Sequence, residues 1–164
     1  MEDIISIDVG VLVNGWIGDN ARTVMIGAKD PEVIRLVKTA ELSLDAAIAQ
    51  AVEGNRISDI SHAIERTATC SGFSVVKEFV GHGVGRSMHE EPQIPNYGTK
   101  GTGIQLRSGM TLAIEPMVNL GKPEIEVGPD GWTALTRDRK PAAHFEHTVL
   151  ITDKGPEILT IAKN

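Results

Sequence analysis

Alternating apolar and polar residues open the chain and predict a β-hairpin. Residues 4–13 show the period-2 pattern of a strand with one apolar face. The apolar positions are Ile5, Ile7, Val9 and Val11. Asn14-Gly15 follows as a strong signal for a hairpin turn, and residues 21–26 are expected to form the returning strand. Asp8 falls on the opposite face of the first strand, which we interpret as the face away from the core.

Two helices are expected after the hairpin. Asp30 is a favourable N-cap and Pro31 a favourable first helical residue, so a helix begins there and runs toward Gly54. Its apolar positions at helical spacing are Val37, Ala40, Leu44, Ala47, Ile48 and Ala51. A second helix is expected to begin near Ser58 and to stop at Gly72. Its apolar positions are Ile60, Ile64 and Ala68.

Short strands dominate the rest of the chain. We expect strands within residues 73–79, 111–118, 144–152 and 157–161. The segment 92–108 is rich in Gly, Pro, Asn and Thr and is expected to be a loop. A hairpin, then two helices, then several strands is the order of an α+β fold with an antiparallel or mixed sheet, rather than of an alternating βαβ array.

Composition and charge argue against nucleic-acid-binding, membrane-bound and secreted classes of protein. The net charge is −6 without a Lys/Arg cluster, which argues against a nucleic-acid or anionic-membrane surface. No apolar run approaches the roughly 18 residues that span a bilayer, and the first residues do not resemble a secretory signal. The lone Cys70 allows no internal disulfide, so we expect a reducing cytoplasm and a buried structural thiol.

Three carboxylates stand inside apolar, strand-like runs. They are Asp8 in SIDVGV, Glu115 in TLAIEPMV and Glu146 in HFEHTVLIT. Taken singly, each has an ordinary interpretation as a solvated strand residue or a salt-bridge partner. A buried carboxylate, however, is costly unless something cationic compensates it. Asp19 follows the hairpin turn and would approach Asp8 if the two strands pair.

His82 lies in the glycine-rich segment GHGVGR. The glycines allow the backbone to approach another group closely. A nucleotide-binding loop would require a helix directly after the glycines, and the prolines of HEEPQIP forbid one. A zincin motif is excluded as well, because the residue four positions after His89 is Gln93 rather than histidine.

Together, two Asp, two Glu and one His form an oxygen-rich donor set with one imidazole. Such a set favours a hard to borderline divalent ion such as Mn, Fe, Co or Zn. Four carboxylates exceed the charge that one dication neutralises, so two ions are expected. Two ions that share carboxylates are suited to metal-assisted hydrolysis.

Four stretches of the chain resemble the type I methionine aminopeptidases, which have the pita-bread metallopeptidase fold. They are SIDVGVLVNGWIGDNART, GFSVVKEFVGHGVGRSMHEEPQIPNYG, LRSGMTLAIEPMV and DGWTALTRDRKPAAHFEHTVLIT. They occur in family order and cover nearly the whole chain. The segments FEHT, GWT and IEPM favour this family over the related prolidases and aminopeptidase P.

The resemblance implies a role for each site residue. The implied metal ligands are Asp8, Asp19, His82, Glu115 and Glu146. Asp19 and Glu146 would bridge the two ions, and Glu115 would also shuttle a proton to the leaving amine. His89 would hydrogen-bond the scissile amide and stabilise the tetrahedral intermediate. Trp132 would help to wall the pocket for the methionine side chain.

The chain departs from the family pattern in three respects. Met88 stands where an aromatic residue is expected and His144 where glutamine is common. The chain also starts almost on the first ligand-bearing strand, whereas family members carry a substantial segment before it. We therefore expect residues 1–164 to form one metallopeptidase domain, a pita-bread fold incomplete at the N-terminus. It would comprise the last hairpin of the first half and the complete second half.

The implied activity is removal of the initiator methionine from peptides and nascent proteins whose second residue is small. The alternative is a catalytically weak binding module of the same fold that needs a partner. Absence of the preceding segment would leave a sheet edge exposed, so we expect self-association. The expected partner is a peptide or nascent chain with N-terminal Met, with no nucleic-acid or membrane partner.

Overall fold

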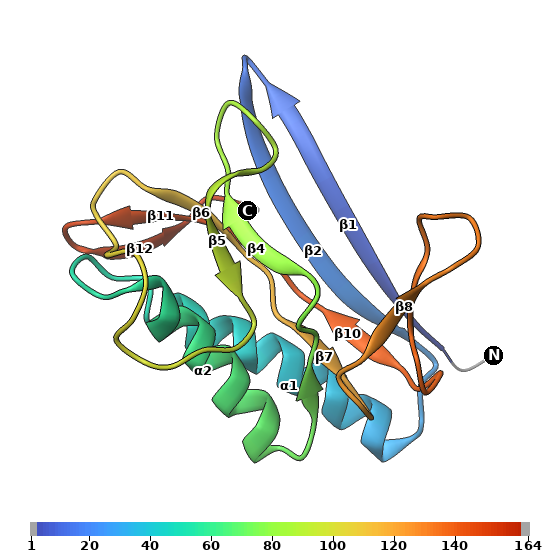
Figure 1. The fold of residues 1–164 in the computed structure, drawn as a ribbon. Coiled ribbons are helices and arrows are strands. Elements are labelled where there is room, and N and C mark those ends of the chain that lie inside the picture. Colours follow the sequence, from blue (N-terminus) through green and yellow to red (C-terminus); the bar gives the residue numbers. More distant parts are fainter. Residues whose placement is uncertain (1–2, 162–164) are drawn as a thin grey trace.

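A long β-hairpin, two helices and a series of short strands follow one another in the computed structural model, which describes residues 3–161 (Figure 1). The hairpin consists of β1 (Asp3–Val13) and β2 (Trp16–Ile26), and the helices are α1 (Pro31–Ile48) and α2 (Ile57–Cys70). The short strands are β3 (Ser74–Val75), β4 (Val80–Gly83), β5 (Glu90–Pro95), β6 (Thr111–Ile114), β7 (Met117–Asn119), β8 (Ile125–Val127), β9 (Ala134–Thr136), β10 (Ala142–His144), β11 (His147–Thr152) and β12 (Gly155–Ile158). The expected α+β class is confirmed.

Two antiparallel sheets are connected at two places, where β6 of one is followed by β7 of the other and β10 is followed by β11. One has the strand order β12-β11-β6-β4-β5 and the other β10-β7-β3. The segment 111–118, expected to be one strand, is broken at Glu115-Pro116 into β6 and β7. The segment 144–152 is broken at Phe145-Glu146, because the Glu146 N–H donates to Ala21 O of the hairpin, 2.9 Å away. Each break releases a glutamate from the regular ladder.

The expectation of a loop at residues 92–108 is partly wrong, because the first residues of this segment belong to β5. This strand contains Pro92 and ends at Pro95, and it lies at the edge of the five-stranded sheet. Proline lacks the N–H that an inner strand needs, but an edge strand tolerates it. The strand expected within 73–79 shrinks to β3, and the one expected at 157–161 is β12.

The helices lie side by side against one face of the sheets (Figure 1). The Asp30 carboxylate caps α1 by accepting the Glu32 N–H at 2.9 Å, as expected. The core between helices and sheets includes Leu36, Ala40, Leu44, Ile60, Ile64, Leu112, Ile114, Val118, Val149 and Ile151. The expected burial of Cys70 is wrong, because the thiol lies exposed at the last residue of α2. No helix within residues 3–161 has the length and apolar character to cross a membrane.

The hairpin turn forms as expected, but the expected packing of the apolar face of β1 is wrong. Both turn residues have positive φ, Asn14 at 52° and Gly15 at 79°. The apolar face of β1 is exposed, with Ile7 53% and Val9 49% accessible. Asp8, on the opposite face, is exposed as expected, and its carboxylate lies within 4.8 Å of a ligand atom of Glu146. A period of two separates the faces of a strand, but it does not say which face packs inward.

Candidate metal centre

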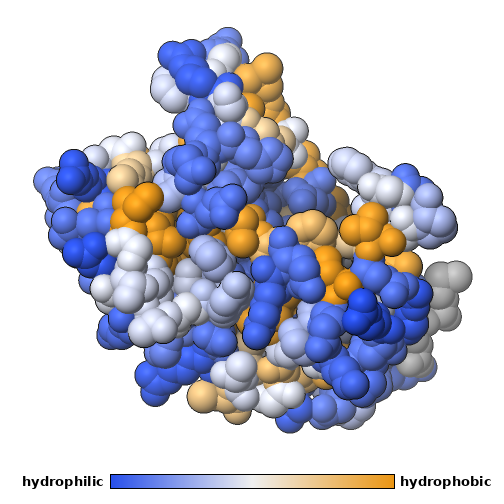
Figure 2. Space-filling view, in the orientation of Figure 1, coloured by the Kyte–Doolittle hydropathy of each residue, from blue (hydrophilic) through white to orange (hydrophobic). Residues whose placement is uncertain are grey.

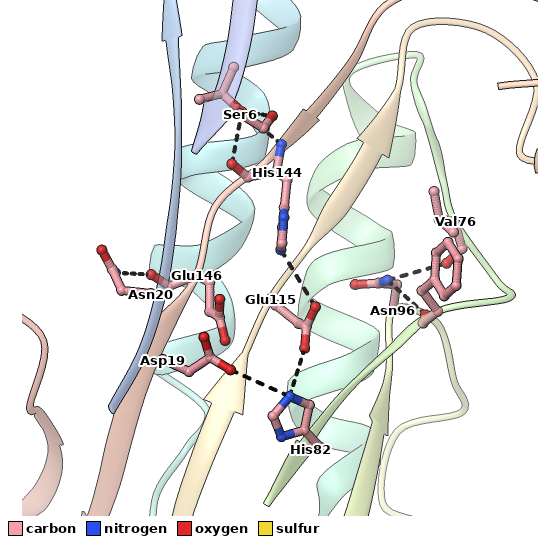
Figure 3. A network of polar contacts seen from close by, with 11 residues as sticks. Ser6, Asp19, Asn20, Val76, His82, Asn96, Glu115, His144 and Glu146 are labelled. Atoms are coloured by element: carbon pink, nitrogen blue, oxygen red, sulfur yellow. Dashed lines mark hydrogen bonds and ion pairs between the residues drawn. The ribbon is translucent and has the colours of Figure 1, made fainter. Parts of the chain in front are cut away.

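Three strands and two strand breaks bring the five predicted ligands to one place. Asp8 comes from β1, Asp19 from β2, His82 from β4, Glu115 from the β6–β7 junction and Glu146 from the β10–β11 junction. The two junctions contact each other, because the Phe145 N–H donates to Pro116 O at 3.4 Å. The hairpin lies alongside the second junction, so that Asp19 faces Glu146 (Figure 3). A ligand atom of Asp8 lies within 4.8 Å of one of Glu146.

His82 lies beside two of the acidic side chains, Glu115 and Asp19. Its Nε2 is 3.4 Å from Glu115 Oε1 and 3.8 Å from Asp19 Oδ2 (Figure 3). Its Nδ1 is 2.9 Å from the Gly83 carbonyl oxygen. Because a carbonyl only accepts, Nδ1 is the donor in this hydrogen bond, and Nε2 is the ring nitrogen placed to ligate a metal ion.

The glycines beside His82 permit close packing of three strands. A Cβ on Gly81 would lie 2.5 Å from the Ala113 carbonyl oxygen, and a Cβ on Gly83 would lie 2.3 Å from the Glu91 carbonyl oxygen. Any side chain at either position would therefore displace β4 from its neighbours. The close approach predicted for GHGVGR is thus with adjacent strands, and it fixes the backbone of His82.

Burial and mutual repulsion favour protonated carboxyl groups in this cluster. Burial, reinforced by the charges of Glu115, Asp19 and Asp8, raises the pKa of Glu146 to about 9. Burial and the Asp8 charge also raise the pKa of Asp19, although His82 opposes the shift. The protein alone therefore compensates these charges poorly, whereas a bound cation would reverse both shifts.

Ligand atoms in the cluster fall into two groups of three. Those of Asp19, His82 and Glu146 lie within 4.8 Å of one another, and so do those of Asp8, His144 and Glu146. Glu146 Oε1 and His144 Nε2 are buried without a hydrogen-bond partner among residues 3–161. Unsatisfied buried donors and acceptors of this kind are costly. Carboxylate oxygens and imidazole nitrogens that lack partners fit a divalent ion.

Threonine hydroxyls join the hairpin to the second junction. Thr148 Oγ1 accepts the Asp19 N–H and donates to the Asp19 carbonyl, both at 2.9 Å. Thr23 Oγ1 does the same for His144, accepting its N–H at 2.9 Å and donating to its carbonyl at 2.8 Å. The Asn20 side-chain amide also donates to the Glu146 carbonyl.

These supporting residues were not predicted from the sequence. The alternation of 144–152 places Thr148 on the same face as His144 and Glu146, which was the available signal. Its partner is more than a hundred residues away along the chain, however, so only the fold reveals the contact.

Of the other two predicted site residues, His89 lies against His82, whereas Trp132 is almost fully exposed. The ring centroids of His89 and His82 are 4.4 Å apart in a T-shaped arrangement. The β4–β5 loop that carries His89 is tied to the hairpin, because the guanidinium carbon of Arg86 lies 3.9 Å from the centroid of the Trp16 ring. Trp132 is 89% exposed between β8 and β9, so its predicted role in the pocket stays a prediction.

Residues 1–153 match the metallopeptidase family M24. A methionine aminopeptidase of Clostridium acetobutylicum is 47% identical over 161 residues, which cover 98% of this chain and 64% of that protein. The chain thus spans slightly less than two thirds of the length of this curated relative.

Solved structures agree with the sequence match. The crystal structure of a methionine aminopeptidase from Thermotoga maritima superposes with a TM-score of 0.96 at 52% identity, over 98% of this chain and 64% of that one. A prolidase from Pyrococcus furiosus gives a TM-score of 0.75 at 24% identity, covering 99% of this chain and 42% of that one, and so shares the fold. The expected pita-bread fold is confirmed, and the chain belongs to metallopeptidase family M24.

Proposed function

We propose that this protein is a methionine aminopeptidase that removes the N-terminal initiator methionine from peptides and nascent proteins in the cytoplasm. The observation that supports the proposal is that one imidazole and four carboxylates lie close together in this protein, a member of a metallopeptidase family. The similarity to methionine aminopeptidases over nearly the whole chain supports the substrate class.

In the proposed centre, two divalent ions (Co, Mn, Fe or Zn) are held by a set of five ligands. The set is Asp8, Asp19, His82, Glu115 and Glu146. Bound ions of this kind polarise the scissile carbonyl and make water nucleophilic at neutral pH. Two ions would balance the charge of the four carboxylates, two of which, Asp19 and Glu146, have pKa values raised by burial and by neighbouring carboxylates.

Glu115 and His89 are the proposed catalytic residues. Glu115 takes a proton from the attacking water and delivers it to the amine nitrogen as the C–N bond breaks. His89 hydrogen-bonds the scissile amide and stabilises charge on the tetrahedral intermediate. The indole of Trp132, which is 89% exposed, offers apolar surface against which the methionine side chain can pack.

Replacing His89 with alanine should lower kcat for Met-Ala-Ser about 100- to 1000-fold, the cost of losing one donor to a developing oxyanion. The measurement is methionine released by the Mn(II)- or Co(II)-loaded protein. His62→Ala serves as the control, because His62 lies half-buried on α2 and hydrogen-bonds Gly98 O instead of a site residue. A wild-type protein that binds two ions yet releases no methionine would contradict the activity and favour a binding module.

We further propose that two copies associate through the exposed apolar face of β1. Ile5, Ile7, Val9 and Val11 are each about half exposed on this face. Within residues 3–161, β1 is paired along its length only with β2, so its other edge is free for a second copy. In Figure 2 apolar surface, in orange, follows the upper part of the hairpin. A contiguous exposed apolar surface of this kind is typical of an association site.

Light scattering during size-exclusion chromatography tests the association. The wild type should run as a dimer whose fraction rises with concentration, and Val9→Lys should shift it to monomer because a charge cannot be buried at the contact. Leu42→Lys is the matched control, since Leu42 is an exposed apolar residue on α1. A wild type that stays monomeric over the whole concentration range would refute self-association.

A further inference from the structure

We infer that His144 is an additional metal ligand, so that each ion of the proposed dinuclear centre has its own imidazole. The inference rests on the proposed metal centre but goes beyond the ligand set implied by the family resemblance, in which His82 supplies the single imidazole. It assigns a role to the residue that stands where glutamine is common.

The His144 side chain points into the cluster of carboxylates. Its Nε2 lies 3.5 Å from Glu115 Oε2, on the side of Glu115 opposite His82 (Figure 3). Its ligand atom also lies within 4.8 Å of those of Asp8 and Glu146. The Nε2 atom is fully buried and lacks a hydrogen-bond partner among residues 3–161. A buried imidazole nitrogen without a partner, facing three carboxylates, is suited to metal coordination.

The backbone of His144 is held rigidly against the hairpin that supplies Asp8. Thr23 Oγ1 bonds both the N–H and the carbonyl of His144, at 2.9 and 2.8 Å. Ser6 Oγ, on the same strand face as Asp8, lies 2.8 Å from Thr23 Oγ1. Orientation of a ligand by hydrogen bonds to its surroundings is what a metal site requires.

The two groups of donors then have matching composition. Asp19 and His82 form one with Glu146, and Asp8 and His144 form the other with the same glutamate. Imidazole favours borderline ions such as Zn, Co or Fe over Mn or Mg. The second ion should therefore bind more tightly, and with a stronger preference for borderline metals, than an all-carboxylate position would allow.

X-ray absorption of the protein loaded with two equivalents of Co(II) counts imidazoles directly. The wild type should show one imidazole per cobalt on average, and His144→Gln should show half that number. In calorimetry, the same substitution should weaken the second Co(II) at least about tenfold, in the range seen when a metal site loses a supporting residue. His62→Gln, on α2 away from the cluster, should change neither value.

The outcomes separate this inference from the proposed function. One imidazole per two cobalts in the wild type, unchanged in His144→Gln, would overturn the role of His144 and leave the dinuclear centre intact. It would assign His144 to a hydrogen bond with Glu115 instead. Failure to bind cobalt stoichiometrically would overturn both. If the variant does not fold, the imidazole count of the wild type still decides.

Discussion

Replacing Glu146 with glutamine should stabilise the metal-free protein and, at the same time, abolish stoichiometric binding of divalent ions. Glu146 is buried, and burial together with three neighbouring carboxylates raises its pKa to about 9. At neutral pH the unfolded chain ionises this group freely, whereas the folded protein must keep it protonated. Glutamine has similar shape and no charge to lose, so this cost disappears.

The sign of the pH dependence follows from the raised pKa. Between the ordinary glutamate pKa of 4.5 and its raised pKa of about 9, Glu146 binds more protons in the folded than in the unfolded state. Its contribution to stability is therefore fully present below pH 4.5 and is lost as pH rises to about 9. The slope approaches about 1.4 kcal/mol per pH unit inside this window. Asp19, whose pKa is also raised, adds to the same trend.

Urea unfolding in EDTA at pH 5, 7 and 9 measures this effect. The wild type should lose stability across the series, and Glu146→Gln should lose much less, with a gain at pH 7 of about 3 kcal/mol as an upper bound. With excess Co(II) the order should reverse, because only the wild type gains stability from binding. Glu157→Gln, at an exposed position of β12, is the matched control. A metal-free Glu146→Gln protein less stable than wild type at pH 7 would show that the glutamate is not destabilising there.

Replacing Thr148 with valine should destabilise the protein and weaken metal binding together. Thr148 is only 2% exposed, and its hydroxyl bonds both the N–H and the carbonyl of Asp19 at 2.9 Å. Valine keeps the shape but leaves a buried N–H and a buried carbonyl unsatisfied, at about 1–3 kcal/mol for each. It also frees the backbone of Asp19, a proposed metal ligand, and loss of such support typically costs about 10- to 100-fold in metal affinity.

Thr148→Ser separates positioning from packing, because it keeps the hydroxyl and loses only the methyl group. Serine should restore most of the Co(II) affinity measured by calorimetry, while urea unfolding retains part of the destabilisation. Thr67→Val is the control, since the Thr67 hydroxyl donates to Ala63 O within α2, at 2.8 Å, away from the cluster. Equal metal affinity in Thr148→Val and the wild type would contradict the positioning role.

Local signals in the sequence were sufficient for the hairpin, the helix starts and the choice of candidate ligands. Asn14-Gly15 and Asp30-Pro31 act through backbone geometry and capping, which depend on adjacent residues alone. The exposure of the apolar face of β1 could not be predicted, because alternation separates two faces without saying whether either one is buried. The strand β5 was missed because its prolines argue against a strand unless the edge position is known.

The break at Glu115 has a local signal, because Pro116 fits only an edge, a bulge or a strand end, whereas the break at Glu146 has none. The Glu146 N–H leaves the ladder of its sheet for Ala21 O on the hairpin, a partner far away along the chain. For the same reason the pairing of Thr148 with Asp19 and of Thr23 with His144 emerged only with the fold. The candidate ligands could be chosen from the sequence by their chemistry, whereas their positions relative to one another depend on long-range contacts.

The origin of the ligands in remote segments gives a bound ion a mechanical role. Asp8 lies near the beginning of the chain and Glu146 near its end, yet both belong to one group of donors. An ion coordinated by both would close a loop that contains most of the protein, as a disulfide would. Such a cross-link lowers the entropy of the unfolded chain most when the closed loop is long. Loss of metal would then lower the free energy of unfolding of the protein as well as remove the proposed hydrolytic activity.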